Sequence, residues 1–174
     1  SVKVHVEYQR ANQVYDDVLG NVVDIGLVAY PQKESKLEIL ALKPEKMVLI
    51  CAPGHAFTKS KGLKFSHLEG QKFIGFEADI PTRKAIDLEL KEHGITIKHV
   101  MEFDNIETVK RAVEIGAGVS IVPAGTVAQE VSKNTLVAMP FVDIELDRPI
   151  GLIHKKSKVL SPAMKQFIAS LQAI

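Results

Sequence analysis

The sequence predicts an α/β protein with two Rossmann-like subdomains and a central cleft. Apolar runs of strand length alternate with amphipathic helical segments along the whole chain. A strand–helix–strand pattern over residues 101–127 is typical of a right-handed crossover onto a parallel sheet. Residues 53–72 are polar, carry little periodicity, and indicate a passage from one subdomain to the other.

The composition is that of an ordinary globular protein. Lys and Arg total 22 against 21 Asp and Glu, so the formal net charge is only +1. No dense basic run is present, which argues against a surface built for nucleic acid. The single cysteine excludes an internal disulfide and, with N-terminal residues that alternate like a strand rather than a signal peptide, favours a cytoplasmic location. The apolar runs are too short to cross a membrane.

Both chain ends are expected to form the first subdomain, residues 1–52 plus 147–174. Residues 2–8 alternate apolar and polar side chains, as in a half-buried strand. A short helix follows, which Asn12 can cap and Gly20 can end. The next strand, residues 22–29, is almost continuously apolar, as buried parallel strands are. Further strands are predicted at 37–43, 46–52 and 150–154, and a closing helix at 162–171.

The middle of the chain, residues 53–146, is expected to form the second subdomain. A strand at 72–76 leads into a helix that has Pro81 in its first turn and Gly94 just beyond its end. A strand at 95–103 follows. The last predicted elements of this subdomain are a helix at 126–131 and a strand at 135–141.

Residues 101–127 also contain signals for where their helix and strand begin and end. Either Asp104 or Asn105 can cap the helix that begins at Ile106. Gly116 is placed for a left-handed helix end, and Gly118 for a tight turn into a strand that Pro123 ends. Such a unit gathers loops and helix N-termini at the carboxyl edge of the sheet, where α/β proteins bind ligands.

Four segments, in order along the chain, resemble the effector-binding domain of LysR-type transcriptional regulators. They are the helix, glycine and buried strand of residues 16–28, MVLICAPGHAF at 47–57, LEGQKFI at 68–74, and the helix followed by GAGVSIVP that ends at 123. The resemblance implies a fold like that of type 2 periplasmic binding proteins. It also implies a non-enzymatic domain that binds a small, anionic metabolite between its lobes and transmits this binding to a separate DNA-binding domain.

The resemblance further implies that the chain is N-terminally incomplete. The first strand and helix of the family's domain, and its winged helix-turn-helix, are not visible before Ser1. Contact with DNA is therefore expected only through a domain absent from this chain. A homo-oligomer, dimer or tetramer, is expected for the full-length regulator.

Two predicted helix starts are candidate parts of a ligand site. Free amides at a helix N-terminus favour anions, Thr82 adds a hydroxyl, and Arg83 can pair bidentately with a carboxylate. The alternative is that Thr82 caps its helix and Arg83 is a solvated surface charge. The resemblance implies a ligand site made of Thr82, Arg83, Asn105, Asp104, Pro123, Val122, Ala29, Tyr30, Phe76 and Pro81.

The remaining candidates of that site also have local explanations. Asp104 and Asn105 can act simply as helix caps, and Pro123 as a strand terminator. Tyr30 can equally be a packing residue.

Cofactor and catalytic signals are weak. Cys51 and His55 could form a thiol–imidazole pair, but four residues across a Pro-Gly turn do not guarantee contact. The histidines lack paired metal-ligand spacing, and Gly116-Ala117-Gly118 follows a helix, the reverse of the dinucleotide-binding order. No metal or cofactor is therefore expected. The rivals to a regulator's sensing domain are a periplasmic-type solute-binding protein and a Cys51-dependent enzyme.

Overall fold

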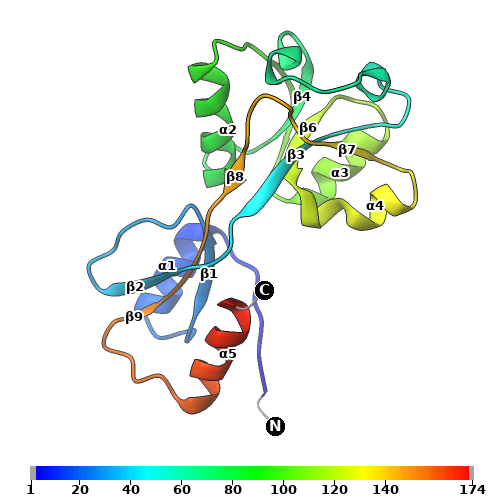
Figure 1. Ribbon diagram of the computed structural model, residues 1–174. Helices are drawn as coiled ribbons and strands as arrows, with labels where there is room; N and C mark the ends of the chain where they lie inside the picture. Colours follow the sequence, from blue (N-terminus) through cyan, green and yellow to red (C-terminus); the bar gives the residue numbers. More distant parts are fainter. Residues whose placement is uncertain (1–2, 173–174) are drawn as a thin grey trace. The chain divides into compact units, whose positions relative to one another are not determined.

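The computed structural model describes residues 3–172, and the chain forms two units (Figure 1). Unit 1 comprises Ser1–Pro44 with Pro149–Ile174, and unit 2 comprises Glu45–Arg148. The sequence instead suggested boundaries that leave residues 45–52 and 147–148 in the first subdomain. These residues belong to unit 2, because the strand at residues 45–51 pairs with other strands of that unit, residues 147–148 among them.

Unit 1 is a three-stranded antiparallel sheet with two helices. Strand β9 lies in the middle, between β1 and β2. Its buried core combines side chains of helix α1 and of each strand, namely Val18, Val28, Leu37 and Ile153. The elements are α1 (Ala11–Leu19), β1 (Gly26–Ala29), β2 (Leu37–Ala41), β9 (Ile150–Lys155) and α5 (Pro162–Gln172).

Two predictions for this unit are wrong. Residues 3–10 form no strand, and Val4, Val6 and Tyr8 are 58%, 64% and 95% exposed. A strand needs a neighbouring backbone, and no described strand pairs with these residues. Val2, also part of that prediction, lies outside the described residues.

Strand β1 also differs from its prediction. It is shorter than predicted, antiparallel to β9, and buried on one face only, with Val28 4% and Leu27 50% exposed. Apolar residues on both faces did not mean burial on both faces, because an antiparallel sheet can leave one side open.

Unit 2 is built around a mixed sheet. Strand β4 runs parallel to β5, and on its other side Phe73 forms a parallel bridge with Val119, next to β6. Strand β3 then joins β6 and β7 in antiparallel pairs, and its first residues pair with β8. The strands are β3 (Glu45–Cys51), β4 (Lys72–Phe76), β5 (Lys98–Phe103), β6 (Ser120–Pro123), β7 (Val137–Met139) and β8 (Asp147–Arg148).

The helices of unit 2 cover this sheet. Strand β3 is buried on both faces, because its alternate side chains enter two apolar clusters. Leu49 packs in one cluster with Phe73, and Ile50 packs in the other with Val109 of α3. The helices are α2 (Pro81–Glu92), α3 (Ile106–Glu114) and α4 (Ala128–Ser132), with short 3-10 turns at Ala56–Lys59, Phe65–Leu68 and Ala124–Val127.

The stretch from β5 to β6 forms largely as predicted. Asn105 rather than Asp104 is the cap of α3, and its side-chain oxygen accepts from the Thr108 backbone N–H at 3.0 Å. Gly116 has a φ of +76°, which is the left-handed helix end. The parallel relation of β4 to β5 and to Val119 confirms the parallel part of the predicted sheet.

Gly118 is required by a close approach of two backbones. A Cβ at this position would lie 2.6 Å from the carbonyl oxygen of Lys72 in β4. At the same point Val119 donates its N–H to that oxygen at 2.9 Å, and accepts from the N–H of Ile74 at 2.9 Å. The absence of a side chain therefore permits β4 and β6 to adjoin.

Replacing Gly118 by Ala tests this contact. We expect Gly118→Ala to lower the free energy of unfolding by about 1–3 kcal/mol, because the obstructing atom is backbone. Gly125→Ala is the control, since a Cβ there meets nothing within 4 Å, and it should change stability by less than about 0.5 kcal/mol. Urea unfolding measures both variants, and equal stabilities would contradict the assigned role of Gly118.

Candidate functional site

The candidate site lies at the edge of unit 2 where β4, β5 and β6 end. The ends of β4 and β5 are joined by a hydrogen bond from the Glu77 N–H to the Phe103 carbonyl oxygen, at 3.0 Å. Strand β3 runs the opposite way and begins at this edge, because Met47 pairs with Pro123. The predicted residues at this edge are Phe76, Pro81, Thr82, Arg83, Asp104, Asn105, Val122 and Pro123.

The first turn of α2 is the part of this edge best suited to an anion. Its cap residue is Ile80, which has no side-chain acceptor, and Pro81 occupies the first turn. The backbone N–H groups of such a turn carry a partial positive charge. No cap side chain competes with a ligand for them.

Thr82 is held by an arginine that the sequence did not point to. Thr82 is 4% exposed, and its Oγ1 accepts a hydrogen bond from Nε of Arg148 at 3.1 Å. Nη1 of the same guanidinium donates to the carboxylate of Glu45. Thr82 is therefore not a local cap. The sequence holds no local signal for this contact, since Arg148 lies 66 residues from Thr82.

Arg83 is buried, so the alternative of a solvated surface charge is wrong. It is 7% exposed and its Nε donates to both oxygens of Asp87, at 2.9 and 2.8 Å. Its Nη1 donates to the Phe76 carbonyl oxygen and to Glu102, both at 2.7 Å. These acceptors tie α2 to β4 and β5. A direct contact of Arg83 with ligand stays a prediction.

The carboxylates around Arg83 also set the charge states there. Burial by itself would lower the pKa of Arg83, but the hydrogen bond with Glu102 and the charge of Asp87 outweigh it, so the pKa is raised. The hydrogen bond from Arg83 lowers the pKa of Glu102. Burial, then the Arg83 charge, lower the pKa of His99, which lies 3.8 Å from Asp87. These directions favour the charged form of Arg83 and of Glu102, and the neutral form of His99.

The start of α3 is occupied by its own cap. The Asn105 side-chain oxygen accepts from both the N–H and the hydroxyl of Thr108, each at 3.0 Å. Its amide nitrogen donates to Asp104 at 3.0 Å. The capping function that the sequence left open for Asn105 is thus realised, and any ligand contact there stays a prediction.

The other predicted residues divide between core, edge and unit 1. The side chain of Val122 is fully buried in an apolar cluster, and the Pro123 carbonyl oxygen accepts from the Thr126 hydroxyl at 2.6 Å. In unit 1, Ala29 is the last residue of β1 and Tyr30 follows it, with a φ of 51° and an N–H that donates to the Pro149 carbonyl oxygen at 2.8 Å. They belong to a different unit from the rest of the predicted site.

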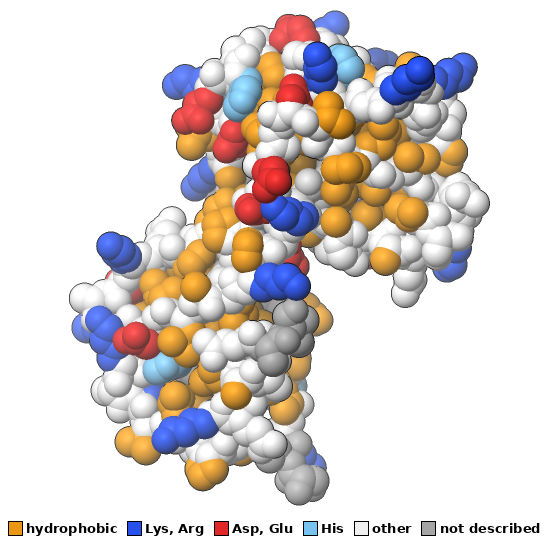
Figure 2. Space-filling model, viewed as in Figure 1, with side chains coloured by type: hydrophobic (Ala, Val, Ile, Leu, Met, Phe, Trp, Pro, Cys, Tyr) orange, Lys and Arg blue, Asp and Glu red, His pale blue; other side chains and the backbone are white. Residues whose placement is uncertain are grey.

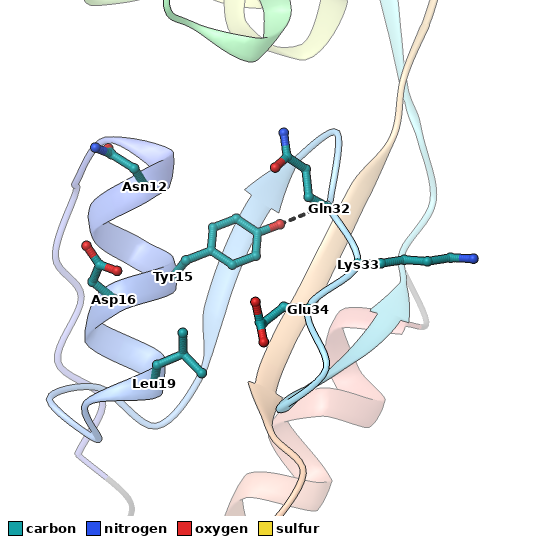
Figure 3. A pocket seen from close by; sticks show the side chains of 7 residues that line it. All are labelled: Asn12, Tyr15, Asp16, Leu19, Gln32, Lys33 and Glu34. Carbon is teal, nitrogen blue, oxygen red and sulfur yellow. Dashed lines mark hydrogen bonds between the residues drawn. The ribbon is translucent and has the colours of Figure 1, made fainter.

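Unit 1 has a hollow of about 300 Å³ that contains none of the predicted residues (Figure 3). Tyr15 of α1 forms one wall, and its hydroxyl accepts from the Gln32 backbone N–H at 2.7 Å. The carboxylates of Asp16 and Glu34 lie at the hollow. The backbone hydrogen bond from Lys36 lowers the pKa of Glu34, which keeps it ionised. With Lys33 as the one basic residue of the lining, two carboxylates outnumber one ammonium group, and this balance does not favour an anionic ligand.

Cys51 lacks the environment of a nucleophile. It lies in the core with no exposed surface, and this burial raises the pKa of its thiol. The His55 ring instead accepts from the Phe57 N–H at 3.3 Å through Nδ1 and packs edge-on against the Phe57 ring. The geometry therefore contradicts a Cys51–His55 pair.

On the face seen in Figure 2, acidic and basic side chains are interspersed, in line with the net charge of +1. Among residues 3–172, no group of three or more His, Cys, Asp and Glu side chains could hold a metal ion. Within the same range, no helix is both long and apolar enough to cross a membrane.

Sequence comparison identifies related regulators. The family model described as "LysR substrate binding domain" matches residues 1–174. An uncharacterized HTH-type transcriptional regulator of Escherichia coli K12, YbhD, is 28% identical over 98% of this chain and 54% of its own length. A RuBisCO operon transcriptional regulator of Allochromatium vinosum is 30% identical over 84% of this chain and 49% of its own length. The chain thus spans about half the length of these curated relatives, which are regulators and not enzymes.

Solved structures share the fold. The regulatory domain of Synechocystis PCC6803 CcmR, in complex with 2-PG, has a TM-score of 0.87 at 21% identity, over 98% of this chain and 82% of that one. The effector binding domain of QuiR, in complex with shikimate, has a TM-score of 0.82 at 21% identity, over 95% of this chain and 78% of that one. These likenesses confirm the two-lobed α/β fold of the type 2 periplasmic binding proteins that the sequence predicts.

Because Arg83 donates hydrogen bonds to two carboxylates and a carbonyl, its replacement should lower the stability of the protein. We expect Arg83→Met to lower the free energy of unfolding by about 1–3 kcal/mol, because two carboxylates and a carbonyl lose a buried donor. Arg111→Met is the matched control, since Arg111 also sits on a helix with a glutamate partner but its side chain is 69% exposed, and it should cost less than about 1 kcal/mol. Urea unfolding compares them, and an equal cost would contradict the structural role of Arg83.

The buried thiol predicts slow alkylation. Iodoacetamide should modify Cys51 at least about 100-fold more slowly in the native protein than in urea, because reaction requires opening of the core. Mass spectrometry after timed quenching measures this ratio. Rapid modification of the native protein near neutral pH would revive the thiol enzyme as a rival.

Proposed function

The chain belongs to the LysR substrate binding domain family, and from this premise we propose that it is the ligand-sensing domain of a LysR-type transcriptional regulator. We place the binding of a small, anionic metabolite at the edge of unit 2 where α2 and α3 begin. The observation that carries this proposal is the first turn of α2, which has no capping side chain and lies beside a guanidinium.

Three features of this edge support an anion in particular. The partial positive charge at a helix N-terminus favours negative groups by about 0.3–1 kcal/mol at exposed positions. Thr82 adds a hydroxyl that is already oriented by Arg148. Arginine also recognises carboxylates and phosphates through several N–H groups at once. Together these groups form a donor-rich surface that suits a carboxylate or a phosphate.

The relatives suggest which small molecules to test. CcmR binds 2-PG and QuiR binds shikimate in domains of the same fold. We extend this class of small effector, not the individual compounds, to the present chain. Binding between the two lobes, as the sequence predicts, stays a prediction.

The regulatory step that we propose is a population shift. A ligand with different affinity for two states of the domain changes their ratio by that difference and by no more. In the full-length regulator, this shift would alter how a homo-oligomer, dimer or tetramer, holds separate DNA-binding domains. Such a regulator would act in the cytoplasm.

Calorimetric titration with a panel of carboxylates and phosphates, including 2-PG and shikimate, tests this proposal. We expect at least one anion to bind, and Thr82→Val to weaken its binding about ten-fold or more, because valine keeps the shape but removes the hydroxyl. Thr58→Val is the control, since the Thr58 hydroxyl bonds to His55 in a distant loop. An anion that binds wild type and Thr82→Val equally would exclude Thr82 as a ligand contact.

A further inference from the structure

We propose that Arg148 is a positioning residue that joins the start of α2 to both segments where the chain passes between its two units. Unit 2 begins at Glu45 and ends at Arg148. These two residues are register partners in the β3–β8 pair, and their side chains form an ion pair. The third partner is Thr82, whose hydroxyl accepts from Arg148 at 3.1 Å.

The contact with α2 distinguishes Arg148 from its neighbour in the same ribbon. Lys46 of β3 pairs with Glu145 and Asp147, at 2.9 and 3.0 Å, and its side chain is 59% exposed. Both partners of Lys46 lie in or just before β8, so this pair stays within the ribbon. Arg148 is only 27% exposed in its side chain and reaches a residue of α2. Arg148 therefore transmits displacements between the helix and the ribbon, and Lys46 does not.

Of the two arginines at this edge, Arg148 is the one that could give up a present hydrogen-bond acceptor and bind a ligand anion instead. Arg83 is held by two carboxylates and a backbone carbonyl. Arg148 is held by one carboxylate and one neutral hydroxyl. An anion beside Thr82 competes with Glu45 for this guanidinium, because both present negative oxygens to the same donors. A bound anion would thus weaken the Arg148–Glu45 ion pair, which joins the first and last residues of unit 2. This consequence rests on the proposed function.

A double-mutant cycle measures this linkage without any ligand. In the described part of the chain, no hydrogen bond or ion pair joins Thr82 directly to Glu45, and both bond to the guanidinium of Arg148, so we expect coupling between them to pass through Arg148. We expect the unfolding equilibrium constant of Thr82→Val with Glu45→Gln to differ about three-fold or more from the product of the single effects. The difference should vanish in an Arg148→Lys background, because one ammonium cannot replace a planar fork of donors.

Thr82→Val with Glu145→Gln is the matched control pair, since Glu145 bonds to Lys46 and not to Arg148. For this pair, the unfolding equilibrium constant of the double variant should equal the product of the two single effects, which means no coupling. Additive effects in the Thr82 and Glu45 cycle, or coupling that persists with Arg148→Lys, would overturn the proposal.

Hydrogen exchange provides a readout that does not depend on mutating Thr82 or Glu45. Arg148→Lys should accelerate exchange of amides in both the first turns of α2 and the start of β3, and leave the first turns of α3 unchanged. Acceleration confined to the ribbon of β3 and β8 would contradict a link to α2.

Titration of wild type with shikimate, 2-PG and inorganic phosphate, followed by the same exchange measurement, separates the two proposals. If no anion binds, the proposed function fails, while the ligand-free cycle still decides the role of Arg148. If an anion binds at Thr82 but the Thr82 and Glu45 substitutions have independent effects on stability, the proposed role of Arg148 is wrong and the proposed function stands.

Discussion

Unit 2 depends on the burial of β3 on both of its faces. Its side chains alternate between two apolar clusters, and its backbone joins β6 on one side and β7 on the other. Each fully buried aliphatic side chain of such a strand contributes about 1.5–3 kcal/mol from the removal of apolar surface from water. Because β3 begins at Glu45, this same strand fixes the position of the first chain passage relative to the ends of β4, β5 and β6.

The edge where these strands end combines two arginines with different roles. Arg83 is enclosed by acceptors from α2, β4 and β5, which makes it a structural connection of the helix to the sheet. Arg148 has fewer partners and lies at the boundary of the unit. A ligand anion needs donors whose other partners are few, since each competing carboxylate weakens its attraction. By this criterion, Arg148 suits the proposed recognition of an anion better than Arg83.

The chain belongs to a family of regulator domains, so the contacts of Arg148 can be considered as part of a ligand-sensing device. A sensing domain must convert the binding of a small molecule into a difference between two states. A single side chain that contacts both the start of a helix and the chain passages offers a physical route for that conversion. The sheet provides a rigid support for it, because β3, β4 and β6 are largely buried and β3 is paired with a strand on each side.

The sequence by itself determined the features that depend on residues within a few positions of one another. These are a cap of α3 at Asp104 or Asn105, of which the structure uses Asn105, the left-handed turn at Gly116, the strand at residues 72–76, and the ordered segments that carry the family resemblance. Only the tertiary structure decided that residues 3–10 lack a strand partner, that β1 is antiparallel, and that Thr82 meets Arg148. The physical reason is that strand pairing and ion pairing are set by chain segments far apart in sequence. Arg148 lies 66 residues from Thr82 and 103 from Glu45, so no local pattern records either contact.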